Sequence, residues 1–201
     1  MGRTLNAFSY LFHPLFVPIY AVLSFFLFSG QNFSYPEVYL LIIQLVIITI
    51  FIPLTFYYLL LSLGKVDSIM LADKEQRKLP LTIHAVLLYV LTQKSITLES
   101  WMELYFFFFG SLISTMLALM MVFAGYKVSL HMIGTTALTT FLIGVSLHFQ
   151  VRLVMPIVVL VLCNGLVASS RLRLRAHTMQ ELVLGSLIGV IPQAALLYFW
   201  L

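Results

Sequence analysis

Long apolar runs separated by short polar connections make up most of the chain. A helix needs about 20 mostly apolar residues to cross the hydrocarbon core of a bilayer. Runs with few or no charges, most of them near that length, lie at residues 14–29, 38–63, 80–93, 104–124, 131–148, 153–169 and 182–201. They predict an all-α fold, a polytopic membrane bundle of about six to seven transmembrane helices. Pro53 is expected to kink the second helix, and Pro80 is expected in the first turn of the short third one.

The composition requires a bilayer rather than water around this bundle. Apolar residues make up 62% of the chain and charged residues 9%, whereas soluble domains average roughly 45–50% and roughly 25%. The 201 residues contain no linker-like or low-complexity stretch, so we expect a single transmembrane domain over residues 1–201. The sequence therefore predicts an integral membrane protein, with membrane lipids as its surroundings.

The polar residues gather in three clusters. The first, between the second and third runs, holds Lys65, Asp67, Asp73, Lys74, Glu75, Arg77 and Lys78. Two crossings later come Lys127, Ser129 and His131, and after two more come Arg171, Arg173, Arg175 and His177. Because an even number of crossings returns the chain to the same side, the three clusters are expected on one membrane face. A net charge of +4, grouped in this way, argues against a nucleic-acid surface and suits anionic head groups or phosphates.

The sharpest local pattern is Ser170-Arg171, five residues, His177, three residues, Glu181. His177 and Glu181 are four residues apart, so on a helix they share a face and the carboxylate can hold the imidazole in one tautomer. A histidine held in this way can act as a nucleophile. Its expected place in the first turn of the last helix puts a bound phosphate near free backbone amides. Arg171 can grip phosphate oxygens with a bidentate fork.

In this pattern the chain resembles the type 2 phosphatidic acid phosphatase superfamily, a group of membrane lipid phosphatases. One signature of that family reads Ser-Arg, five residues, His, three residues, Asp, and it is reproduced from Ser170 to Glu181 with Glu in place of Asp. A second signature, Pro-Ser-Gly-His, is represented by Ser129-Leu130-His131, which lacks the Pro and the Gly. A third, a basic Lys…Arg-Pro segment, has a loose counterpart that lacks the usual six-residue gap and consists of Lys74, Arg77 and Pro80.

The resemblance implies a role for each matching residue. His177 would attack phosphorus, Glu181 would orient it, and His131 would protonate the leaving lipid alcohol. The residues that would bind the substrate phosphate are Arg171, Arg77 and Lys74, with Ser129 and Ser170 as lesser donors. The resemblance implies no cofactor and no metal, because fixed cations neutralise the charge on the equatorial oxygens. The implied partner is a lipid phosphate: phosphatidate, phosphatidylglycerophosphate, a polyprenyl phosphate or diphosphate, and lipid A all stay open, as does the oligomeric state.

Two other classes of protein stay open. A catalytically weak or inactive lipid-phosphate-binding protein or transporter fits the incomplete Pro-Ser-Gly-His signature. A magnesium-dependent prenyl transferase would need paired acidic clusters to carry its metal ions. Asp67, Asp73 and Glu75 could form one such cluster, but the sequence has no second acidic segment.

Several polar residues outside the motifs have a simpler interpretation. Arg173 and Arg175 match no motif position and are expected to anchor lipid head groups. His13 lies on the same side as the three clusters, where a supporting role in the site stays open, but its position beside Pro14 favours placement at the membrane interface. The remaining histidines, His84 and His148, are expected to be structural.

The side of the membrane that holds the three clusters stays open. Basic residues are more numerous there than on the opposite face, which has Lys94 and Arg152, so the positive-inside rule favours the cytoplasm. The resemblance instead implies an outward-facing site for many bacterial members, in the inner (cytoplasmic) membrane.

Overall fold

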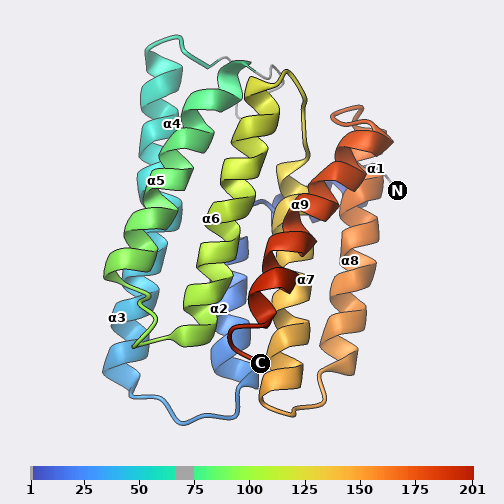
Figure 1. Cartoon of the computed structure of the whole chain (residues 1–201). Helices are drawn as coiled ribbons and strands as arrows, with labels where there is room; N and C mark the ends of the chain where they lie inside the picture. Colours follow the sequence, from blue (N-terminus) through green and yellow to red (C-terminus); the bar gives the residue numbers. More distant parts are fainter. Residues whose placement is uncertain (1, 67–74) are drawn as a thin grey trace.

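The computed structural model describes residues 2–66 and 75–201, which fold into a helical bundle (Figure 1). Its elements are α1 (Gly2–Leu11), α2 (Val17–Phe28), α3 (Tyr35–Val46), η1 (Ile47–Phe51), α4 (Ile52–Ser62), η2 (Glu75–Arg77), α5 (Lys78–Lys94), α6 (Met102–Phe123), α7 (Leu130–His148), α8 (Val154–Arg173) and α9 (Met179–Leu197). The described residues contain no β-strand, which confirms the predicted all-α class.

Five of the described helices are long and apolar enough to cross a membrane. They are Tyr35–Ser62, which joins α3, η1 and α4, and then Met102–Phe123, Leu130–His148, Val154–Arg173 and Met179–Leu197. Two further predicted spans form shorter helices: α2 has 12 residues and α5 has 17. The described residues therefore form the polytopic membrane bundle that the apolar runs predict, with five helices of full spanning length, and the third predicted helix, α5, is short as expected.

The first predicted span, 14–29, begins later than expected. A separate helix, α1, precedes it, and residues 14–16 lie in a turn before α2 starts at Val17. The physical reason is Pro14, since the residue before a proline is kept out of the helical region. Pro18 then lies in the first turn of α2, where its missing amide costs no hydrogen bond.

Two other helices differ from their predicted course. Pro53 is the second residue of α4, just after the π-helical turn η1. That turn accommodates the hydrogen bond that proline cannot donate, so the helix continues through Pro53. The sixth predicted span, 153–169, extends as α8 to Arg173. Arg171 therefore lies in the last turn of a helix, where a cation faces the negative end of the helix dipole.

Helix α7 is the centre of the bundle. Of its most apolar stretch 67% is buried, against 17% for the α3–α4 helix and 17% for α8, so those two helices present most of their surface to lipid. Small residues let α9 approach α7 closely: a Cβ on Gly185 would lie 2.7 Å from the carbonyl oxygen of Ser129. Two side-chain hydroxyls also bond α9 to its neighbours. Ser114 of α6 donates to the carbonyl of Ile188, and Thr136 of α7 donates to the carbonyl of Ser186.

The ends of the long helices place the three polar clusters together. The carboxyl ends of α4, α6 and α8 and the amino ends of α5, α7 and α9 lie at one end of the bundle (Figure 1). Arg77, His131 and His177 therefore share one face, as the count of crossings predicts.

The close contact between α7 and α9 can be tested by adding one methyl group. A Cβ on Gly189 would collide with Thr136 Oγ1 and with the backbone carbonyl of Ile133, so Gly189→Ala should destabilise the protein by ~1–3 kcal/mol. Gly165→Ala on α8 is the matched control, because nothing lies within 4 Å of its Cβ position. Denaturation in detergent should separate the two variants, and equal stability would contradict this packing.

Candidate active site

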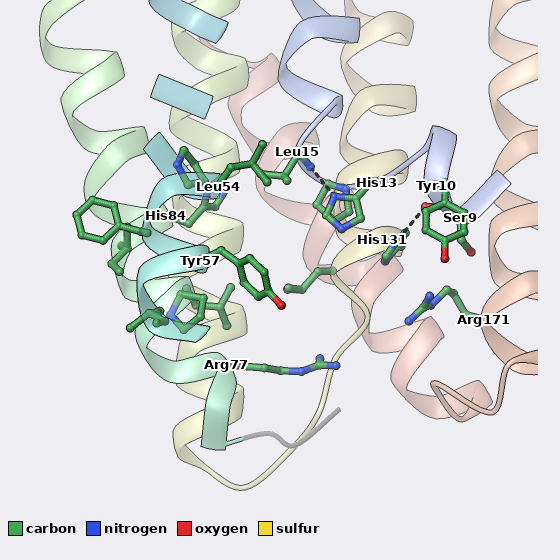
Figure 2. Close-up of a pocket in the computed structure, with 18 of the residues that line it drawn as sticks. Ser9, Tyr10, His13, Leu15, Leu54, Tyr57, Arg77, His84, His131 and Arg171 are labelled. Atoms are coloured by element: carbon green, nitrogen blue, oxygen red, sulfur yellow. Dashed lines mark hydrogen bonds between the residues drawn. The ribbon is translucent and has the colours of Figure 1, made fainter. Parts of the chain in front are cut away.

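One cavity of about 270 Å³ opens between α4 and α5 on one side and α1, α7 and α8 on the other (Figure 2). The motif residues Arg77, His131, Arg171 and His177 all line it. Much of the remaining wall is apolar, with Pro53, Leu54, Phe56, Leu60, Leu81 and Ile83 among the lining residues. The cavity thus joins a cationic end to an apolar wall, which is the chemistry of a lipid with a charged head.

His177 contacts Glu181 as expected, but the two residues do not lie on one face of a helix, because His177 precedes α9. His177 Nδ1 lies 2.7 Å from Glu181 Oε2. Thr178 has an extended backbone and is the N-cap of α9, so His177 precedes the helix instead of lying in its first turn. Glu181 reaches back to the cap, where it also accepts a hydrogen bond from the Thr178 amide, completing a capping box.

This contact determines which nitrogen of His177 is free. A carboxylate can only accept, so Nδ1 carries the proton and donates to Glu181. In the neutral ring, Nε2 then keeps its lone pair. This tautomer, with a lone pair on Nε2, is the one that a nucleophilic histidine needs, and His177 lines the cavity.

Burial and charge keep the His177 ring neutral. Burial is the largest cause that lowers its pKa, to about 4, and the positive charges of Arg77 and Lys127 lower it further. Glu181 opposes both through its hydrogen bond and its charge. Because the lowering effects outweigh this one carboxylate, the imidazole is unprotonated at neutral pH.

Two buried arginines bring positive charge to the cavity. Arg77 and Arg171 are 5% and 4% exposed and reach toward it from opposite sides (Figure 2). Burial lowers the pKa of Arg77, Glu181 raises it, and the charge of Arg171 lowers it again, so the two guanidiniums repel each other. Arg171 forms no ion pair with any residue in the described ranges, and its Nε has no hydrogen-bond partner there. Burying the Arg171 guanidinium in this way is costly unless an anion joins it.

His131 is oriented by the N-terminal helix. Its Nε2 lies 3.1 Å from the backbone carbonyl of Ser9, and a carbonyl can only accept, so Nε2 carries a proton. Any proton that His131 gives to a leaving group must therefore come from Nδ1.

Ser129, Ser170 and Lys127 lie next to the site but do not line the cavity. Ser129 is buried, and its hydroxyl accepts from Met132 N as the N-cap of α7. Ser170 shares a hydrogen bond of 2.8 Å with Ser9. Lys127 donates to the Ala176 carbonyl at 2.9 Å, next to His177. Lys74 lies outside the described residues.

Several cavity residues lie outside the motifs. Ser9, Tyr10 and His13 line the cavity from the α1–α2 segment, and Tyr57 and His84 line it from α4 and α5. His13 was expected at the interface and His84 as structural, because neither lies in a motif or a charged cluster. The signal that could have found His13 is its position on the same face as the three clusters.

Other polar groups lie where they do not contribute to the cavity. His148 pairs with Glu103 at 3.4 Å, at the opposite end of α7. Arg173 and Arg175 are exposed, and their role as head-group anchors stays a prediction. Within residues 2–66 and 75–201, no three His, Cys, Asp or Glu side chains gather as metal ligands.

No family model, no curated protein and no solved structure matches this chain. The resemblance to the lipid phosphatases therefore rests on the motif residues, and their catalytic roles stay predictions.

The burial and the neighbouring charges of His177 predict that its imidazole titrates at a lower pH than a free histidine. Measured by NMR of the imidazole nitrogens, the midpoint should lie well below 6.5, near about 4. Glu181→Gln should lower it further, because the carboxylate raises the pKa, while glutamine can still complete the capping box. A midpoint at or above 6.5 would show an imidazolium ion pair and contradict this balance.

Proposed function

We propose that this protein is an integral membrane lipid phosphatase that removes phosphate through a phosphohistidine intermediate. The observation that carries the proposal is the 2.7 Å contact between His177 and Glu181 at a cavity that also holds two buried arginines and an apolar wall. The partner is a lipid phosphate, and the resemblance places the protein in the bacterial cytoplasmic membrane.

The first chemical step is an in-line displacement at phosphorus. The Nε2 lone pair of His177 forms the N–P bond while the bond from phosphorus to the lipid oxygen breaks. His131 starts this step as an imidazolium, with one proton on Nε2 held by the Ser9 carbonyl and the other on Nδ1. It gives the Nδ1 proton to that oxygen, so the lipid leaves as an alcohol and the His131 ring becomes neutral. In the second step water attacks phosphorus, His131 takes up a proton from it, and inorganic phosphate leaves His177 in its starting state.

The arginines supply electrostatic stabilisation. Charge spreads over the three equatorial oxygens of the transferring phosphoryl group, and positioned donors that are already desolvated stabilise it without reorganising. Arg171 suits this role because its buried Nε has no partner in the described part of the chain. Arg77 is held at the other side of the cavity by its hydrogen bond of 3.1 Å to the Val128 carbonyl.

The second candidate function is binding of a lipid phosphate without turnover. The observation in its favour is Ser129, whose hydroxyl is occupied as the cap of α7 in the segment that lacks the family's Pro and Gly. Such a site would keep the arginines and hold phosphate without completing the reaction.

The proposal is tested by phosphate release from a panel of phospholipid and polyprenyl phosphates. Release should persist in excess chelator, since the resemblance and the fixed cations imply a metal-independent reaction. Vanadate should block it as a mimic of five-coordinate phosphorus, and His177→Ala should abolish it. Loss of release in chelator with recovery in magnesium would contradict the mechanism, and vanadate-sensitive lipid binding without any release would favour the second candidate.

The role of His131 depends on the leaving group. His131→Ala should fail on an alkyl phosphomonoester, whose alkoxide needs a proton, and retain more activity on an aryl phosphate, whose phenolate needs little protonation. The ratio of kcat/KM on the two substrates is the measurement. Equal losses on both would refute its assignment as the general acid.

A further inference from the structure

The segment that joins α1 to α2 belongs to the site, although no motif covers it. Ser9 contacts both catalytic segments: its carbonyl accepts from His131 Nε2, and its hydroxyl meets that of Ser170. Tyr10 and His13 follow it on the cavity wall. These contacts hold α1 against α7 and α8, and His13 follows α1 by two residues.

The proton on His13 is placed by the backbone. Leu15 N donates to His13 Nδ1 at 3.3 Å (Figure 2), so Nδ1 holds a lone pair and the neutral ring carries its proton on Nε2. Burial, and then the charge of Arg171, lower the pKa of His13, which keeps the ring neutral at neutral pH. No residue in the described ranges is hydrogen-bonded to Nε2. His13 thus brings an uncharged N–H donor to the cavity.

This donor lies beyond His131, on the side away from the arginines. The two imidazole rings are 5.3 Å apart and nearly perpendicular, at 85°. The chain then runs along the first turn of α7, since a Cβ on Gly134 would lie 3.0 Å from Val17. In Figure 2 the order from the cationic end is Arg77 and Arg171, His131, His13, and then Leu15 and Leu54.

We propose that His13 is a substrate-binding residue whose Nε2–H donates to an uncharged oxygen on the leaving-group side of the lipid, such as the ester carbonyl or hydroxyl of a glycerol moiety. This inference rests on the proposed phosphatase function. A second phosphate at this position would call for a cation, whereas a neutral imidazole matches an uncharged acceptor. A polyprenyl phosphate presents hydrocarbon there and would leave the N–H unpaired, which disfavours it by about tenfold or more.

The experiment compares two alkyl phosphomonoesters, a short-chain phosphatidate and farnesyl monophosphate, with the full chain in detergent. Wild type should prefer phosphatidate by about tenfold in kcat/KM. His13→Phe keeps an aromatic ring beside His131 but removes the donor. It should lower kcat/KM for phosphatidate about tenfold, mainly through KM, and change farnesyl monophosphate by less than about twofold. His13→Gln restores an N–H donor and should recover most of the loss.

The outcomes separate this inference from the proposed function. Equal losses on both substrates, no loss on either, or a wild type that prefers farnesyl monophosphate would each overturn the role of His13 while leaving the phosphatase intact. If either variant fails to fold, the ratio of wild-type kcat/KM for phosphatidate and farnesyl monophosphate decides whether the site favours an uncharged oxygen on the leaving group. Release from neither substrate by the wild type would overturn this inference, which requires turnover of phosphatidate, while the proposed function is contradicted only if the whole panel of lipid phosphates releases no phosphate.

Discussion

The candidate site depends on the hydrogen bonds of one residue, Glu181. Its Oε2 accepts from His177 Nδ1 at 2.7 Å and from the Thr178 amide at 3.3 Å, while its backbone carbonyl accepts from Ser129 N at 3.2 Å. One residue thereby orients the imidazole, starts α9 and ties α9 to the beginning of α7. The glutamate that replaces the aspartate of the resembling family is also the residue type that a capping box uses at this position.

A second constraint is the positive charge gathered around the cavity. The charges of Arg77 and Lys127 act on His177, whose carboxylate partner Glu181 is also engaged with the cap of α9. Burial is the largest cause that lowers the pKa values of Arg77 and Lys127, and the charges of neighbouring guanidiniums lower them further, against the opposing effect of Glu181. A phosphate dianion in the cavity would oppose this repulsion. The fold can hold these cations because α7 and α9 pack closely through small residues and fix the surrounding backbone.

Much of this arrangement could be predicted from the sequence, because periodicity and spacing are local. The apolar runs predict the long helices, and the count of crossings brings Arg77, His131 and His177 to one face. The contacts of α1 could not be predicted, since Ser9 meets His131 and Ser170 across more than a hundred residues. His177 was expected inside α9, but Thr178 is a better N-cap and excludes it.

The account's central claim is that His177 forms a covalent bond to phosphorus. The most direct test is to mix the protein rapidly with a lipid phosphate that it turns over, quench in alkali, and map phosphorylated peptides by mass spectrometry. The account predicts a phosphoryl group on His177 in the wild type and none in His177→Ala. Rapid phosphate release with no phosphoenzyme, or a phosphoryl group on another residue, would contradict it.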